Sequence, residues 1–293
     1  MVSEKRIHDR IVVGVDGSTA SHQAVMWAAA EARLRHADLI VTHVEPAGSG
    51  AGWTQDRADV DRHELLAASA TAASTRQPGV AVGTLLISGD ISDQLIQLSR
   101  SAGVLVVGID RAVSRAAHGA TGPIEDRVVA HAWCPVVLVA VRLPVHEAAH
   151  DCVLVGLTAD EESVDVLNAA AAEAVLRRAD LRVLIGRAEG SGTTEPDGAP
   201  GGFDTLEQSI ATLGQAQPRL TVTSRHVGER LVDELERESR RADLMVIGCA
   251  QSEDRWSIRT GALSSAMVRQ SHCPVMLVGQ RVGRRATASQ PAA

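Results

Sequence analysis

Residues 11–18 read IVVGVDGS, an apolar run that ends in a glycine and a short acidic turn. The run lacks polar alternation, which is typical of a strand buried on both faces, as the strands of parallel sheets are. A helical pattern follows over residues 19–36. Residues 152–159 read CVLVGLTA, and a second helical pattern follows them, so the same strand–turn–helix unit is predicted twice.

Two later stretches repeat in the same order. SAGVLVVG ends at Gly108 and RADLMVIG ends at Gly248, while HAWCPVVLV covers residues 131–139 and QSHCPVMLV covers residues 270–278. The repeated landmarks lie 139 to 142 residues apart. A nearly constant spacing of this size predicts a tandem duplication of one complete domain.

Each half alternates buried strands with helices, which predicts right-handed βαβ crossovers in an open parallel sheet. We therefore expect two tandem, doubly wound, five-stranded α/β sandwich domains, over residues 1–145 and 150–280, and a flexible tail over residues 281–293. In the first half the expected strands are 11–15, 39–44, 80–87, 104–107 and 136–139, with helices near 19–36, 58–76, 90–101 and 121–132. In the second half the expected strands are 153–157, 181–185, 220–227, 244–247 and 275–278.

Composition excludes several classes of function. The 29 Lys and Arg residues against 36 Asp and Glu residues give a net charge of −7, which disfavours a nucleic-acid binder. No apolar run approaches the roughly 18–20 residues that span a bilayer. Residues 1–10 lack the apolar region of a signal peptide. We therefore expect a cytoplasmic protein without a membrane partner. Lys5 is the only lysine, which excludes a Walker lysine in either half.

VVGVDGS at the start of a tandem βαβ half and CPVVLV at its end resemble the universal stress protein family, in its two-domain bacterial form. The resemblance implies an adenine-nucleotide-binding-like fold. It also implies that ATP is held by a G-x2-G-x9-G-[S/T] loop after the fourth strand and by an acid after the first. Members usually pair through the last strand and act as stress or dormancy regulators without turnover.

Carried onto the first half, the resemblance implies a nucleotide site at Gly14, Asp16, Val44, Gly108 and Gly122. Three departures weaken the phosphate loop. Gly122 lies 14 residues after Gly108, where the motif requires 13. Arg111 stands where the loop has its second glycine, and Pro123 takes the place of the hydroxyl residue and offers no N–H. The alternative interpretation of residues 16–19 is that they stop the strand and cap the following helix through Ser18 or Thr19. His43, near the same strand ends, is expected to be a hydrogen-bonded histidine rather than a general base.

In the second half the corresponding site is Gly156, Gly248, Gly261, Ser264 and Ser265. The loop keeps its overall spacing, but Gln251 replaces the second glycine and Ala262 replaces the hydroxyl residue. Thr158 stands where the first half has its strand-end acid. Neither half carries a complete motif.

These residues lead to one expectation and one alternative. The expectation is a non-catalytic stress or dormancy regulator that binds ATP, with or without Mg²⁺, weakly because both phosphate loops are altered. Its expected partners are a regulatory protein and a second copy of the chain, paired through the last strands. Alternatively, the two halves of one chain pair with each other through those strands. The alternative is a scaffold of the same fold that has lost ATP binding. Cys134 and Cys273 are expected to be small buried thiols.

Overall fold

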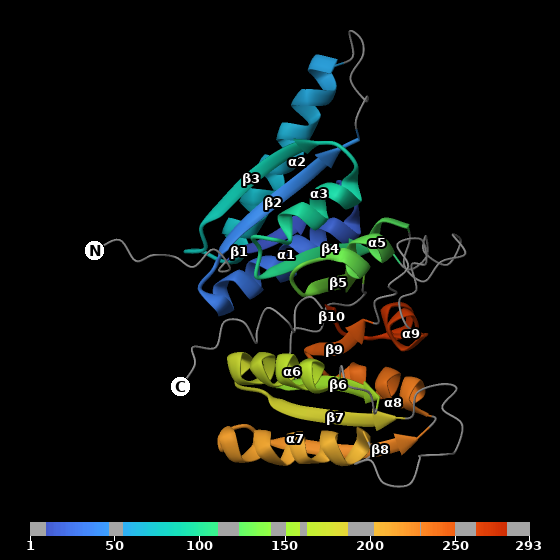
Figure 1. The fold of residues 1–293 in the computed structure, drawn as a ribbon. Helices are drawn as coiled ribbons and strands as arrows, with labels where there is room; N and C mark the ends of the chain where they lie inside the picture. Colours follow the sequence, from blue (N-terminus) through green and yellow to red (C-terminus); the bar gives the residue numbers. More distant parts are fainter. Residues whose placement is uncertain are drawn as a thin grey trace. The chain divides into compact units, whose positions relative to one another are not determined.

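A computed structural model describes residues 10–46, 55–110, 123–141, 151–158, 163–186, 202–228, 230–249 and 262–279. These residues form two compact units, 10–141 and 151–279. Each unit is a parallel five-stranded sheet with helices on both faces (Figure 1). The predicted fold class is confirmed. The predicted tail over residues 281–293 lies outside the described residues.

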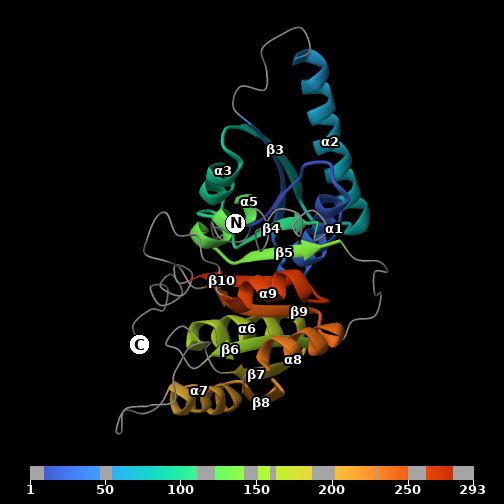
Figure 2. The same cartoon turned by 90° about the vertical axis from the view of Figure 1, so that its right-hand side faces the viewer.

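In the first unit the strands lie in the order β3-β2-β1-β4-β5, and every recorded strand pair is parallel. The strands are β1 (Arg10–Gly14), β2 (Asp38–Glu45), β3 (Val82–Ser88), β4 (Val104–Ile109) and β5 (Val136–Ala140). The helices are α1 (Thr19–Arg35), α2 (Gln55–Arg76), α3 (Ile91–Leu98) and α5 (Pro123–His131). Helices α1 and α2 cover one face of the sheet, and α3 and α5 cover the other (Figure 2).

The second unit repeats this plan in the order β10-β9-β6-β7-β8. Its strands are β6 (Cys152–Thr158), β7 (Asp180–Gly186), β8 (Val222–Gly228), β9 (Leu244–Cys249) and β10 (Val275–Gly279). Its helices are α6 (Ser163–Arg177), α7 (Gly202–Ala216), α8 (Leu231–Glu238) and α9 (Ala262–Gln270), with a 3-10 turn η1 (Ser239–Arg241) after α8. Helices α6 and α7 lie on one face, and α8 and α9 on the other (Figure 2).

The duplication extends to buried hydrogen bonds at the ends of α3 and α8. The Ser99 hydroxyl donates to the Ile96 carbonyl and accepts the Trp133 N–H at 2.9 Å. The Ser239 hydroxyl likewise accepts the His272 N–H at 2.8 Å. Both serines are almost fully buried. In each half this serine ties the third helix to the turn that precedes the last strand.

Every predicted strand is present, with ends within two residues of the predicted ones, and the strand predicted to end at Val15 ends at Gly14. The strands predicted from 80 and 220 start at Val82 and Val222. The reason is local: the N–H of Val80 donates to Gln77, and the N–H of Leu220 donates to Gln217, so both residues still belong to the preceding turn. Within the described residues no helix is long and apolar enough to cross a membrane.

Candidate functional site

Asp16 lies directly after β1, in the turn that leads into α1. Its Oδ1 accepts the N–H of Ser18 at 2.9 Å, and the Ser18 hydroxyl caps α1 by accepting the Ser21 N–H at 3.1 Å. Gly17 has a φ of +84°, which a glycine adopts without strain. The capping interpretation of this run is therefore confirmed for Ser18. Asp16 contributes one oxygen to the turn, and its side chain remains exposed.

The carboxyl group of Asp16 is held in its ionised form. Partial burial acts to raise its pKa, but hydrogen bonds from Ser18 and Ser21 outweigh that effect and lower the pKa below the ordinary value. An ionised carboxylate only accepts hydrogen bonds. The end of β1 therefore presents a negative acceptor group suited to the hydroxyl or amino donors of a ligand.

The hydrogen-bond ladder between β1 and β2 ends beside Asp16. In β2, Leu39 and Glu45 bond toward β3, whereas the Thr42 carbonyl accepts the Val15 N–H at 2.8 Å. Because bonding sides alternate along a parallel strand, the N–H and C=O of Val44 face β1. The next ladder bond would join the Val44 N–H to the Val15 carbonyl, and no such bond is present among the described residues.

The Val15 carbonyl has a different partner. The Nδ1 of His43 lies 2.7 Å from the Val15 oxygen. A carbonyl oxygen only accepts, so Nδ1 carries the proton and donates. The prediction that His43 is a hydrogen-bonded histidine is confirmed. Val44, which is only 7% exposed, has an N–H and a C=O directed at the space beyond the end of β1. A buried backbone N–H needs an acceptor, so this position fits a ligand with a matching polar edge.

The predicted residues of the first half are therefore partly brought together. Gly14 ends β1 in register with Thr42, so Gly14, Asp16 and Val44 lie at the carboxyl ends of adjacent strands. Gly108 lies in the neighbouring strand β4, two residues beyond Val106, which pairs with Val13. Gly122 lies outside the described residues.

Gly108 also has a packing role. A Cβ added there would lie 2.3 Å from the backbone of Ala20 in α1. The glycine at this position is required by the close approach of the helix, whether or not a ligand is present. This role was not visible in the sequence, because it depends on a contact between residues far apart in the chain.

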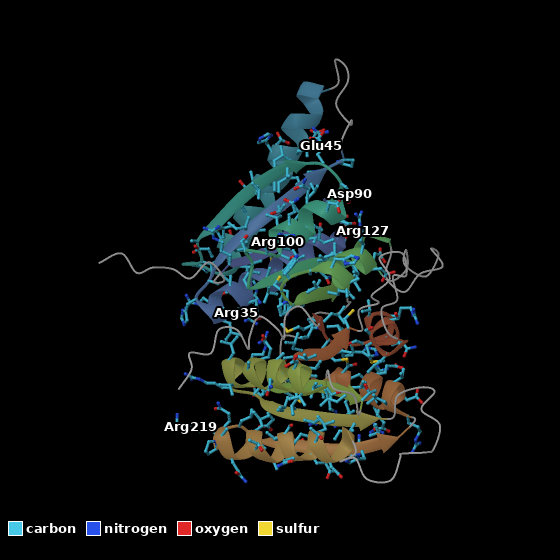
Figure 3. The ribbon with its side chains drawn as sticks, viewed as in Figure 1. Arg35, Glu45, Asp90, Arg100, Arg127 and Arg219 are labelled. Atoms are coloured by element: carbon cyan, nitrogen blue, oxygen red, sulfur yellow. The ribbon has the colours of Figure 1, made fainter. Side chains whose placement is uncertain are left out.

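An ion-pair cluster lies on the carboxyl-end side of the first unit. Arg127 of α5 and Asp90 are labelled in Figure 3. Arg127 pairs with Asp90 at 3.0 Å and with Asp93 at 2.6 Å, both at the start of α3. Asp90 also caps α3 by accepting the Asp93 N–H. The cluster ties α3 to α5, the helix that follows the predicted phosphate loop.

In the second unit, the strands stay paired at the position equivalent to Val15 and Val44. In the pairing of β6 with β7, Gly156–Leu184 is the counterpart of Gly14–Thr42. The strands stay paired for two more residue pairs and end with Thr158 opposite Gly186. By the same alternation, the Gly186 N–H faces the Leu157 carbonyl. The Thr158 carbonyl accepts the Ser163 hydroxyl. The second unit thus has neither the acid nor the open backbone groups of the first.

Helix α8 packs tightly over these strand ends. A Cβ at Gly156 would lie 2.5 Å from the Leu235 side chain, and one at Gly186 would lie 2.7 Å from Leu231. Gly186 is therefore needed for packing, because its neighbours include the Leu231 Cβ and the Gly228 carbonyl oxygen, whereas at Gly156 the Leu235 side chain would have to shift. At Gly248 an added Cβ would meet Val166 of α6 at 3.0 Å.

The predicted phosphate donors of the second half are placed in α9. Ser264 is 1% exposed, a placement that does not favour its predicted contact with a phosphate. Ser265 is partly exposed. Gly261 lies outside the described residues. Among the described residues, no group of three or more His, Cys, Asp or Glu side chains could hold a metal ion.

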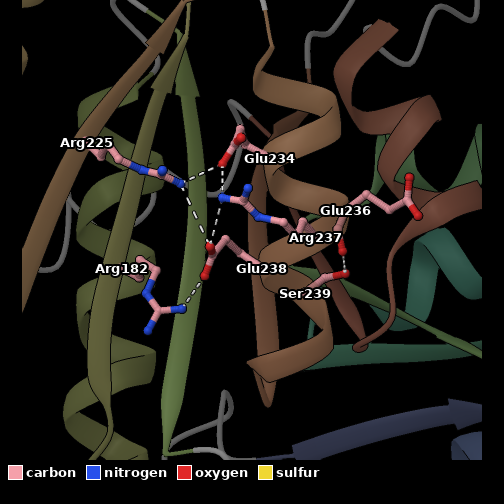
Figure 4. Close-up of polar contacts among 7 residues, drawn as sticks. All are labelled: Arg182, Arg225, Glu234, Glu236, Arg237, Glu238 and Ser239. Carbon is pink, nitrogen blue, oxygen red and sulfur yellow. Dashed lines mark hydrogen bonds and ion pairs between the residues drawn. The ribbon is translucent and has the colours of Figure 1, made fainter.

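A network of charges covers the β7–β8–α8 face of the second unit (Figure 4). Glu238 pairs with Arg182, with Arg237 at 3.4 Å and with Arg225 at 3.8 Å, while Glu234 pairs with Arg225 at 2.7 Å and with Arg237. The strand arginines that complete the network are 9 and 56 positions away from their glutamates.

All four cysteines, Cys134, Cys152, Cys249 and Cys273, are buried, and none of them forms a disulfide. The predicted burial of Cys134 and Cys273 is confirmed. Burial raises the pKa of the Cys152 thiol above its usual range. A neutral buried thiol is a weak nucleophile.

The model of the universal stress protein family matches residues 8–140 and again residues 151–279. A universal stress protein of Mycolicibacterium smegmatis is 28% identical over 289 residues, covering 92% of this chain and 97% of that protein. The crystal structure of a universal stress protein from Archaeoglobus fulgidus has a TM-score of 0.73 at 15% identity, covering 93% of this chain and 98% of that one. Another A. fulgidus universal stress protein, solved in complex with dAMP, covers 45% of this chain and 98% of its own, at 23% identity and a TM-score of 0.37.

The two family matches fall on the two units in turn and together span most of the sequence. The curated relative matches along nearly its whole length, and the larger solved structure has the same fold over nearly its whole chain. The chain therefore belongs to the universal stress protein family, as a tandem member with one family domain in each half.

Proposed function

We propose that the first unit binds adenine nucleotide at the carboxyl ends of β1 and β2, and that the protein is a regulator rather than a turnover enzyme. The observation that carries the proposal is the pair of Val44 backbone groups, left without a β1 partner beside the ionised Asp16. A base with one acceptor and one donor on adjacent atoms complements a backbone N–H and C=O, and adenine has such an edge.

Asp16 suits the sugar side of the ligand. Its carboxylate accepts hydrogen bonds, and one oxygen is already fixed by the Ser18 N–H. Ribose hydroxyls are donors of the matching kind. Gly14, Gly108 and Gly122 would border the same site. The resemblance to the family supports adenine nucleotide as the ligand.

Weak affinity is part of the proposal. The first half has Pro123 at the hydroxyl position of the phosphate loop, and Arg111 in place of a glycine. A proline offers no N–H to a phosphate oxygen. ATP, with or without Mg²⁺, is the proposed ligand, and the base and the ribose supply most of the recognition.

The second unit is proposed not to bind nucleotide. Its ladder extends over the position that would meet a base, and Thr158 replaces the acid. We propose one nucleotide per chain, with the second unit as a structural or partner-binding half. A regulatory protein and a second copy of the chain remain proposed partners, and the cytoplasm the proposed location.

The continued β6–β7 pairing in the second unit and the altered phosphate loops favour one alternative. It is a scaffold of the same fold without nucleotide binding. Calorimetric titration of nucleotide-stripped protein with Mg-ATP, ADP and GTP separates the two. The proposal expects one ATP site per chain, about tenfold or more weakened by Asp16→Ala, and unchanged by Thr158→Ala, the matched position in the second unit. No heat and no thermal shift at millimolar ATP would favour the scaffold. Phosphate release over hours tests for turnover.

A further inference from the structure

We infer that His43 is a positioning residue that keeps the β1–β2 ladder open, and thereby decides that the first unit is the half that can bind. The inference rests on the proposed function, because it concerns the same site. His43 itself is not proposed to touch the nucleotide.

The contact that carries the inference is the 2.7 Å hydrogen bond from His43 Nδ1 to the Val15 carbonyl. Val15 is bonded to β2 twice, through its N–H to Thr42 and through its carbonyl to the His43 side chain. The imidazole takes the acceptor that the Val44 N–H would otherwise use. The chain after Val15 then turns into the Asp16–Ser18 bend instead of extending β1.

The second unit supplies an internal comparison. The residue at the position of His43 is Ile185, whose side chain has no hydrogen-bond donor. The residue at the position of Val15 is Leu157. There the strands stay paired through Leu157–Ile185 and Thr158–Gly186. The half that lacks the histidine is the half in which the ladder continues. Asp16 is replaced in the same half, by Thr158.

Two substitutions separate the hydrogen bond from the bulk of the side chain. His43→Ile installs the residue that the second unit already carries at this position in the strand, so a folded protein is expected. His43→Asn keeps a donor at the place of Nδ1, because the asparagine Nδ2 occupies the corresponding atom position. Thermal unfolding of both variants is recorded first.

The first readout needs no nucleotide. A trans-hydrogen-bond scalar coupling between the Val44 amide nitrogen and the Val15 carbonyl carbon reports the missing ladder bond directly. We expect the coupling to be absent in the wild type and in His43→Asn, and present in His43→Ile. The ¹⁵N shifts of His43 should report a proton on Nδ1. Absence of the coupling in a folded His43→Ile protein would overturn the inference.

The second readout is ATP affinity by calorimetry. We expect His43→Ile to weaken binding about tenfold or more, and His43→Asn to retain binding within about threefold. Equal loss in both variants would also overturn the inference, since a donor at this position would then not be what matters. The wild type could bind no nucleotide while the coupling is still absent in the wild type and present in His43→Ile. That result would overturn the proposed function and leave the role of His43 in the strand ladder standing.

Discussion

Gly108 in β4 faces the backbone of Ala20 in α1 so closely that an added Cβ would lie 2.3 Å from its carbonyl carbon and oxygen. The neighbour is backbone and cannot rotate away. The first helix of the first unit therefore rests directly on the strand, without a side chain between them. Gly248 has the matching place in the second unit but faces the Val166 side chain at 3.0 Å.

Gly108→Ala should destabilise the first unit by about 1–3 kcal/mol, because the helix must shift away from the sheet. Gly248→Ala should cost less, since a valine side chain adjusts more easily than a backbone. Urea unfolding of the two variants, followed by amide signals from each unit, measures both. Equal losses would mean that the approach of α1 is not specially close.

Stability should depend on Asp16 in acid. Its pKa is lowered in the folded protein, so its ionised form stabilises the fold at pH values above the unfolded-state pKa, about 4. That contribution disappears as the pH falls through the folded-state pKa. Wild type should therefore exceed Asp16→Asn in stability at pH 7, and the difference should shrink toward zero in strong acid. Chemical unfolding between pH 2 and pH 7 measures the difference. A difference that does not depend on pH would contradict this account.

Thr42 offers a stabilising substitution. It is fully buried, and its hydroxyl has no hydrogen-bond partner among the described residues. Valine has nearly the same shape without the polar atom, so Thr42→Val should raise the free energy of unfolding by about 1 kcal/mol. Thermal and urea unfolding check this. Since Thr42 lies on the strand next to Val44, ATP titration of the same variant is the control that the site remains intact.

Glu238 holds three arginines of the second unit together (Figure 4). Glu238→Gln should lower stability by about 1 kcal/mol at low ionic strength and by less in 1 M NaCl, because salt screens exposed ion pairs. Glu236→Gln is the control, since Glu236 is more exposed and contacts Arg240 at 3.4 Å and His272 at 3.7 Å. An effect of Glu238→Gln that persists in high salt would point to a packing role instead.

Parts of the candidate site could be predicted from local pattern. An acid after an apolar run, as at Asp16, lies at the carboxyl end of a parallel strand by topology alone, and Val44 follows from the next strand in the same way. The predicted phosphate loops stay predictions. Gly122 and Gly261 lie outside the described residues, and Ser264 is buried in α9, which its sequence position did not indicate.

The sequence by itself determined the tandem duplication, the alternation of buried strands and helices, and the burial of Cys134 and Cys273. These features follow from apolar periodicity and spacing, which act over short stretches of chain. Only the tertiary structure decided that His43 occupies the Val15 carbonyl, that the ladder stays open at Val44 and continues to Gly186 in the second unit, and that Gly108 is required by α1. Those outcomes depend on strand register and on distances between residues far apart in the chain, and a one-residue difference in register changes which backbone groups are paired.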